Sequence, residues 1–264
     1  MSLPVFFVDA FTHKPFAGNA AAVCILDGSR EDAWLQRVAS EMNQAATAFL
    51  LPENDGYRLR WFSAKVELEL CGHGTLASAH TLWEQGYLPL DTEARFYTRG
   101  GALTARRDGE WIELNFPAKP EEEAENLPVF AESLGTTPRY IGKSQLDYIV
   151  ELESEEAVRG IQPDFQRLAT VPARGVIVTA PATNSDSEYN FVSRFFCPSV
   201  GINEDPVTGS AHCVLSPFWS KRLGREQLTG YQASARGGIV RVRHDGDRVL
   251  LGGQAVTVLS GTLL

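Results

Sequence analysis

The stretch Glu204–Cys213 reads EDPVTGSAHC and places an acid, a turn, a hydroxyl and an imidazole directly before an amphipathic run, Val214–Trp219. Asp205 precedes a proline, and Gly209 opens the following run. The first N–H groups of a helix have no partner within the helix and carry the positive end of its dipole. The stretch therefore predicts a polar site at the N-terminus of a core helix from Ser210 to about Leu223.

An earlier stretch, Leu70–Ala77 (LCGHGTLA), also ends an extended run and opens a helix. Aligning Gly74 with Gly209, 135 positions later, pairs Thr75 with Ser210. The offset is close to half of the 264 residues, so we interpret the chain as a duplication. Each half would supply one helix N-terminus to a shared cleft that binds a carboxylate. Two unrelated glycine-rich helix caps are the alternative interpretation.

The composition limits the classes of partner and compartment. A formal net charge of -9 argues against nucleic acid or an anionic membrane as partner, although a small anionic substrate stays compatible with it. Four cysteines without a CxxC pair predict reduced thiols and a cytoplasmic protein. The sequence has no run of 18 apolar residues and its beginning does not look like a signal peptide, so we expect no membrane span.

Two helices are expected in the first half, one from a capping box at Ser29 and Asp32 to about Asn43, and one from about Thr75 to Gln85. Strict alternation of apolar and charged residues predicts half-exposed antiparallel strands rather than the continuously apolar strands of a doubly wound sheet. The expected strands are 5–9, 20–26, 47–51, 57–61, 66–70, 95–99, 102–107 and 111–116.

The charged, proline-punctuated segment 117–128 is the best candidate for a linker, with a surface loop inside one domain as the alternative. The second half then repeats the plan of the first around its own core helix. Its expected short strands and helices are 147–151, 154–158, 175–179, 189–197, 238–243, 248–251 and 255–259.

Seven segments resemble one known family, and together they span nearly the whole chain. They are Val8–Phe11, Pro15–Asn19, Arg60–Phe62, Cys71–Ala77, Ser193–Phe196, Gly201–Cys213 and Gln232–Gly238. In them the chain resembles the phenazine-biosynthesis-like (PhzF-type) isomerases, relatives of diaminopimelate epimerase.

The resemblance implies an α+β fold of two pseudo-symmetric domains, each a mostly antiparallel β-barrel around a central helix. We expect the first domain to comprise residues 1–117 together with a final strand at about 253–264. The second would comprise residues 118–252, with the active site between the two domains and a homodimer as the usual assembly.

The chemistry that the resemblance implies is a proton shift on a small carboxylic acid, without cofactor or metal. In the best-understood member of the family it is the isomerisation of a dihydro-hydroxyanthranilate. Carried over by residue, Asp205 and His73 would face the reacting atoms. The residues expected to bind the substrate are Gly18, Asn19, Gly72, Gly74, Thr75, Gly209 and Ser210.

One position departs from the family. Its usual acid/base glutamate lies in an Asn-x-x-Glu-Thr segment, and the corresponding segment Asn43–Thr47 (NQAAT) has Ala46 there. Either the usual reaction is lost, another residue has taken over, or the chain is a natural or engineered inactive form. Glu41 is a poor substitute, five residues away on another helix face. We expect an isomerase in which Asp205 and His73 handle protons, and keep a catalytically silent carboxylate-binding protein as the alternative.

Each candidate residue also has a structural interpretation. Asp205 could merely cap a turn, and His73 could be a structural histidine, as we expect of His212. Cys71 matches one thiol of diaminopimelate epimerase, but Pro206 occupies the place of the second thiol. A small buried residue is therefore the favoured interpretation of Cys71.

Two further site types find little support in the sequence. The pairs Cys71/His73 and His212/Cys213 match no ordinary zinc spacing. Gly72-x-Gly74-x-x-Ala77 fits a degenerate dinucleotide fingerprint, but the strand expected before it alternates with glutamates, which disfavours a nicotinamide oxidoreductase.

Overall fold

The chain divides into two compact units in the computed structural model, which describes residues 2–183 and 188–264. Unit 1 comprises Met1–Phe116 and Leu251–Leu264, and unit 2 comprises Pro117–Leu250. The first unit therefore contains both ends of the chain. Within the described residues no helix is long and apolar enough to span a membrane.

The strands of unit 1 pair in the order β18-β1-β2-β3-β4-β6-β7-β8, with β5 beside β4. The pairs β2–β3 and β4–β6 are parallel, and the others are antiparallel. The strands are β1 (Leu3–Ala10), β2 (Asn19–Ile25), β3 (Ala46–Glu53), β4 (Gly56–Phe62), β5 (Glu67–Leu68), β6 (Ala94–Thr98), β7 (Gly101–Asp108), β8 (Trp111–Pro117) and β18 (Ala255–Leu263).

The strands of unit 2 pair in the order β9-β10-β11-β12-β13-β15-β16, with β14 beside β13. Here β11–β12 and β13–β15 are the parallel pairs. The strands are β9 (Glu122–Glu123), β10 (Tyr140–Lys143), β11 (Asp147–Glu151), β12 (Gly175–Pro181), β13 (Phe191–Cys197), β14 (Ile202–Glu204), β15 (Gln227–Gln232) and β16 (Gly238–Asp245), and β17 (Arg248–Gly253) follows.

The two pairing schemes correspond strand by strand. In both units the third and fourth strands of this order, β2 and β3 or β11 and β12, are parallel. Helical segments connect them, because parallel neighbours require a crossover. β18 pairs with β1 as β9 pairs with β10, so the last strand of the chain completes unit 1. The mixed α+β, sheet-rich fold is the one expected, and closure of either sheet into a barrel stays a prediction.

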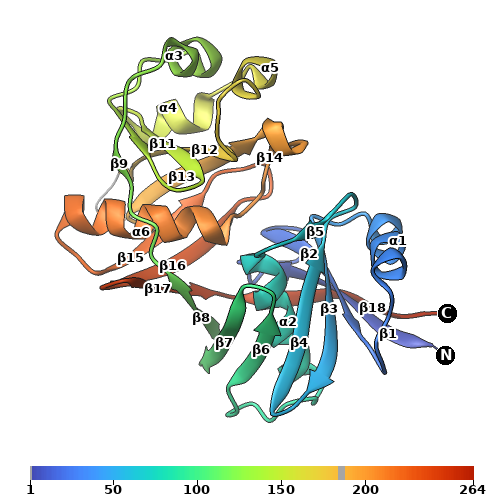
Figure 1. Cartoon of the computed structure of the whole chain (residues 1–264). Coiled ribbons are helices and arrows are strands. Elements are labelled where there is room, and N and C mark those ends of the chain that lie inside the picture. Colours follow the sequence, from blue (N-terminus) through green and yellow to red (C-terminus); the bar gives the residue numbers. More distant parts are fainter. Residues whose placement is uncertain (1, 184–187) are drawn as a thin grey trace. The chain divides into compact units, whose positions relative to one another are not determined.

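Helices α1 (Asp32–Met42) and α2 (Gly72–Glu84) contact opposite faces of the sheet in unit 1 (Figure 1). Phe49 of β3 faces α1 and belongs to the same apolar cluster as Leu35 and Val38 of that helix. α2 packs against β1, β2, β3 and β18, and nearly all of its side chains are buried. A helix without an exposed polar face is a core element.

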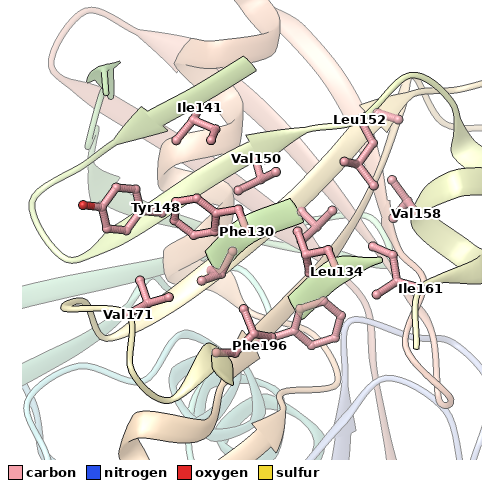
Figure 2. Packing of buried hydrophobic residues seen from close by; sticks show 14 of the residues in the cluster. Phe130, Leu134, Ile141, Tyr148, Val150, Leu152, Val158, Ile161, Val171 and Phe196 are labelled. Carbon is pink, nitrogen blue, oxygen red and sulfur yellow. The ribbon is translucent and has the colours of Figure 1, made fainter. Parts of the chain in front are cut away.

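Unit 2 repeats this arrangement around α6 (Gly209–Leu223), which packs on β15 and β16. The three short helices α3 (Pro128–Leu134), α4 (Glu155–Gly160) and α5 (Phe165–Leu168) contribute to a second apolar cluster on the sheet. Figure 2 shows this cluster, in which Phe130 and Leu134 of α3 pack near Val158 and Phe196.

The proline-punctuated segment after β8 is part of unit 2 and not a free linker. Pro217 lies inside α6, and because proline has no N–H the carbonyl of Cys213 lacks its usual helical donor. The N–H of Lys119 donates to that carbonyl at 3.0 Å, and the N–H of Ala118 donates to the carbonyl of Asp247 at 2.8 Å.

Three expectations for individual elements were wrong. α1 begins at Asp32 with Glu31 at its N-cap, so Ser29 caps nothing. The expected strand 66–70 shrinks to β5, because Val66 is exposed rather than facing a core. β3 continues through Pro52, which pairs with Tyr57 and does not end the strand.

A matching ion pair braces the short strand that precedes each core helix. Arg60 donates to both carboxylate oxygens of Glu67, at 2.7 and 2.9 Å, and its guanidinium lies over Phe62. Arg194 holds Glu204 in the same fork, at 2.8 and 2.9 Å, and lies over the ring of Phe196. Hydrogen bonds from Arg60 to Glu67 raise the pKa of this arginine. The correspondence between the two units thus extends to the side chains that position β5 and β14.

We expect Arg194→Gln to lower the free energy of unfolding by roughly 2 to 3 kcal/mol, because the half-buried Glu204 carboxylate then loses the two charged hydrogen bonds from Arg194. Arg167→Gln is the control, since Arg167 and Glu132 are both more than half exposed. It should cost under about 1 kcal/mol. Urea unfolding followed by circular dichroism measures both free energies of unfolding. Equal losses in the two variants would show that the Arg194–Glu204 pair stabilises the protein no more than an exposed ion pair does.

Candidate active site

The N-terminus of α2 is organised by Cys71, its N-cap residue. The Cys71 sulfur accepts a hydrogen bond from the N–H of Gly74 at 3.3 Å. The Cys71 carbonyl accepts from the N–H and the hydroxyl of Thr75, at 3.0 and 2.7 Å. Cys71 is buried, as expected, and its thiol serves as a capping acceptor.

His73 is the second residue of α2 and is 8% exposed. Its Nδ1 lies 3.3 Å from the side-chain nitrogen of Asn19, at the start of β2. An amide nitrogen can only donate, so with this orientation of the Asn19 amide the ring proton is on Nε2. The Cys71 sulfur lies 3.5 and 3.7 Å from the two ring nitrogens. The fold thus holds the imidazole in one place at the start of the helix.

Gly18 sets the path of the backbone into Asn19. Its φ is +62°, and a Cβ added there would lie 2.1 Å from the carbonyl oxygen of Ala10. The preceding loop is held by the buried Asp9 carboxylate, which accepts the N–H of Phe16 at 2.7 Å. Glycine is required at position 18 for both its conformation and its close approach to β1.

Gly18→Ala should lower the free energy of unfolding by roughly 3 kcal/mol or more, because the clash is with backbone and cannot be relieved by a rotamer change. Gly109→Ala is the matched control, with a φ of +61° and nothing within 4 Å of the added Cβ. That variant should lose about 1 kcal/mol from backbone strain alone. Thermal unfolding of both variants tests the difference, and similar losses would refute the steric argument.

Ala46, the position of the family's glutamate, is the first residue of β3 and is fully buried. It pairs with Ala21, two residues from Asn19 on the same face of β2. Side chains opposite each other in a ladder share a face, so Ala46 lies on the same face of the sheet as Asn19. The structure places position 46 in the same part of unit 1 as Asn19 and His73.

Trp61 is a candidate that the sequence did not single out for a role. It pairs with Ala48, so its side chain is on the same face as Ala46. Its indole packs against Gly74, where an added Cβ would lie 2.8 Å from Cδ1. The indole N–H is buried and has no hydrogen-bond acceptor among the described residues.

Asp205 lies in the turn between β14 and α6, and unit 2 fixes it through several bonds. Its Oδ2 accepts the hydroxyl of Thr208 at 2.5 Å, and its N–H donates to the carbonyl of Phe195 at 3.0 Å. The side chain of Gln232 forms two hydrogen bonds with the same turn. It accepts one from the N–H of Thr208 at 2.9 Å and donates one to the carbonyl of Asp205 at 2.7 Å. The fully buried Gln232 is thus a positioning residue, known from the sequence only as part of a matching segment.

His212 belongs to the interior of unit 2, as expected. Its Nδ1 lies 2.9 Å from the carbonyl of Thr208, one turn earlier on α6. Burial lowers the pKa of His212 to about 4, so the imidazole is neutral at pH 7. Gly209 is buried and Ser210 is half-buried at the start of α6.

Three other kinds of site were considered among the described residues: a reactive thiol, a metal site and a dinucleotide site. Burial raises the pKa of Cys24, Cys197 and Cys213 to about 12, so these thiols stay protonated at neutral pH. Within residues 2–183 and 188–264, no cluster of three His, Cys, Asp or Glu side chains could hold a metal ion. β5, which precedes the Gly72–Gly74 turn, pairs antiparallel with β4 and does not form the parallel unit of a dinucleotide site.

The predicted residues therefore form two groups, one in each unit. The unit 1 half-site comprises Gly18, Asn19, Ala46, Gly72, His73, Gly74 and Thr75. The unit 2 half-site comprises Asp205, Gly209 and Ser210, together with Thr208 and Gln232.

Comparisons with known proteins agree with the resemblance seen in the sequence. A family model described as phenazine biosynthesis-like protein matches residues 8–261. An uncharacterized isomerase of Halalkalibacterium halodurans is 50% identical over 265 residues, covering 100% of this chain and 99% of the relative.

Solved structures give the same result. A phenazine biosynthesis protein of the PhzF family from Enterococcus faecalis is 38% identical, with a TM-score of 0.94 and full coverage of both chains. A hydroxyproline epimerase from Agrobacterium vitis shares the fold at 10% identity, with a TM-score of 0.64 over 99% of this chain and 92% of that chain. The chain belongs to the phenazine biosynthesis-like protein family.

Proposed function

We propose that this protein is a cofactor-independent isomerase or epimerase that moves a proton on a small carboxylic acid. The proposal is supported by relatives that are named isomerases and by the likeness of the fold to an epimerase. The observation that carries it is that each core helix opens beside one fixed side chain whose chemistry suits proton transfer. These side chains are His73 in α2 and Asp205 before α6.

The N-termini of the two core helices would bind the substrate carboxylate. Their first N–H groups have no partner within the helix, and the dipole favours a negative charge. In α2 the N–H of Gly74 already donates to the Cys71 sulfur, so the carboxylate would meet the helix at its first two residues. Gly72 and Gly209 place no side chain at the start of either helix, and Thr75 and Ser210 lie in the first turns. Asn19 and Gly18 would line the same site.

Asp205 would move the proton with the help of His73. One oxygen of the Asp205 carboxylate accepts the hydroxyl of Thr208, and a positioned carboxylate can take a proton from a substrate carbon and return it at another position. The Nε2–H of the neutral His73 ring can hydrogen-bond the negative charge that develops on the substrate. In this proposal both residues act on one molecule, and Ala46 contributes no proton.

A second candidate function is a catalytically silent protein that binds carboxylates. Ala46 favours it, because the residue that supplies the proton in the resembling family is absent while the helix N-termini are retained. This protein would bind the same acids without converting them.

One experiment separates the two functions. Purified protein is offered a dihydro-hydroxyanthranilate and a panel of small cyclic and amino carboxylic acids, with binding measured by calorimetry and isomer formation by NMR. The proposed isomerase converts at least one acid that it binds. Binding of acids without conversion of any would establish the silent alternative, and binding of none would refute both.

A further inference from the structure

Unit 1 contains a pocket of about 380 Å³ at the C-terminal end of α2, away from His73 at its N-terminal end. We call it the first pocket. Its residues come from the end of α2, from β7 and β8, from the start of β18 and from the loop after β1. They are His13, His80, Trp83, Glu84, Arg107, Glu110, Ile112, Gln254, Ala255 and Val256.

Unit 2 contains a corresponding pocket of about 560 Å³ at the C-terminal end of α6, the second pocket. Its residues come from the end of α6 and the loop after it, from β16 and from the segment before β9. They are Pro120, Glu121, Pro217, Ser220, Lys221, Gly224, Arg225, Glu226 and His244. Each unit thus has a pocket at the C-terminal end of its core helix.

The two helix ends carry opposite charges. In the second pocket Lys221 complements the negative end of the α6 dipole, and Arg222 follows it. In the first pocket α2 ends with Glu84, and the last turn of α2 has no basic residue. The α2 end thus places a carboxylate where the dipole favours a cation.

Glu84 is held in position rather than free on the surface. Its carboxylate accepts the hydroxyl of Thr257 at 2.5 Å and lies 3.4 Å from His80 Nε2. A carboxylate accepts about four hydrogen bonds, so capacity remains for a further donor.

The same pocket contains charges of both signs that lack an ionic partner. Among the described residues neither Arg107 nor Glu110 forms an ion pair. Arg107 donates to the carbonyl of Gly109, and Glu110 accepts from Gln254. Trp83 and Ile112 are buried and provide apolar lining between these polar groups.

We propose that the first pocket is a second small-molecule site, which binds a zwitterionic amino acid with an apolar side chain. The ammonium group would lie at Glu84 and the end of α2, where carboxylate and dipole both favour a cation. The carboxylate would pair with Arg107, whose planar guanidinium suits a carboxylate. The apolar side chain would contact Trp83 and Ile112, and the volume accommodates a ligand of this size.

The test titrates the intact protein with L-phenylalanine and L-leucine by calorimetry. Phenethylamine and 3-phenylpropanoate are the matched probes, each with one of the two charges of phenylalanine. The zwitterion should bind at least about tenfold more tightly than either probe, since each charged contact contributes at least that factor.

Two variants replace the charged residues of the first pocket that would contact the ligand. Glu84→Lys and Arg107→His should each weaken binding of the better amino acid about tenfold or more. Both side chains are at the surface, so circular dichroism should show folded protein. Lys221→Glu, the reciprocal change in the second pocket, and Asp205→Asn should leave the affinity unchanged.

The outcomes are distinct from those of the proposed isomerase. Unchanged affinity in Glu84→Lys, equal affinity for the single-charge probes, or no binding of either amino acid would each overturn the second site. Loss of binding in Asp205→Asn would assign the ligand to the unit 2 half-site and would also overturn it.

Discussion

Asp205→Asn lowers the turnover of the identified substrate by about 10²-fold or more, the usual contribution of a positioned acid or base. The amide has no carboxylate to take a proton, yet its oxygen can still accept the hydroxyl of Thr208. Gln232 continues to hold the backbone of the turn. Steady-state kinetics should therefore show a lower kcat, while thermal unfolding should show little change.

Asp164→Asn is the control for this prediction. Asp164 also precedes a helix in unit 2, and its side chain accepts the N–H groups of Gln166 and Arg167. The same loss of charge there should leave turnover unchanged. Full activity of Asp205→Asn would remove Asp205 from the chemistry.

Ala46→Glu raises the rate of proton exchange between substrate and solvent by roughly 10²-fold or more. The introduced glutamate would be attached at a fully buried backbone position, on the same face of the sheet as Asn19 and Trp61. Burial favours its neutral form, which is the form that can donate a proton. The buried N–H of Trp61 would have an acceptor nearby.

Ala46→Gln is the control, because it has the size and hydrogen-bonding oxygen of glutamate but no acidic proton. It should leave the exchange rate at the level of the unaltered chain. Equal acceleration by both variants would mean that filling the site, rather than supplying a proton, changes the rate. No acceleration by Ala46→Glu would show that position 46 does not limit the reaction.

Much of the fold follows from local patterns in the sequence. The alternation in Tyr57–Trp61 correctly predicts β4, with Leu59 buried and Arg58 exposed. The apolar runs after Gly74 and Gly209 predict α2 and α6, because helices without a polar face must be enclosed. β10 and β15 were missed, since Tyr140–Lys143 is very short and Gln227–Gln232 alternates weakly.

The candidate residues came mainly from the family resemblance. His73 and Asp205 were singled out because they lie in segments that match the family, beside glycines that open a helix. Gln232 and Trp61 did not stand out, because their importance depends on partners 24 residues or more away in the chain or on the absence of a partner. Long-range pairing of that kind leaves no local pattern.

The arginine–glutamate pairs are a feature that the two units share. Arg60–Glu67 and Arg194–Glu204 have the same two-bond geometry, whereas Glu84 and Lys221, near the C-terminal ends of α2 and α6, differ in charge. Each pair holds the short strand before its core helix in place, so both units need it.

The most direct test of the proposed reaction is deuterium incorporation from D₂O, followed by NMR, with purified protein, a chelator and no added cofactor. The proposed mechanism predicts that deuterium appears on carbon in at least one small carboxylic acid that the protein binds, and that Asp205→Asn suppresses this signal. Tight binding of such an acid without any deuterium incorporation would contradict proton transfer as the function of this chain.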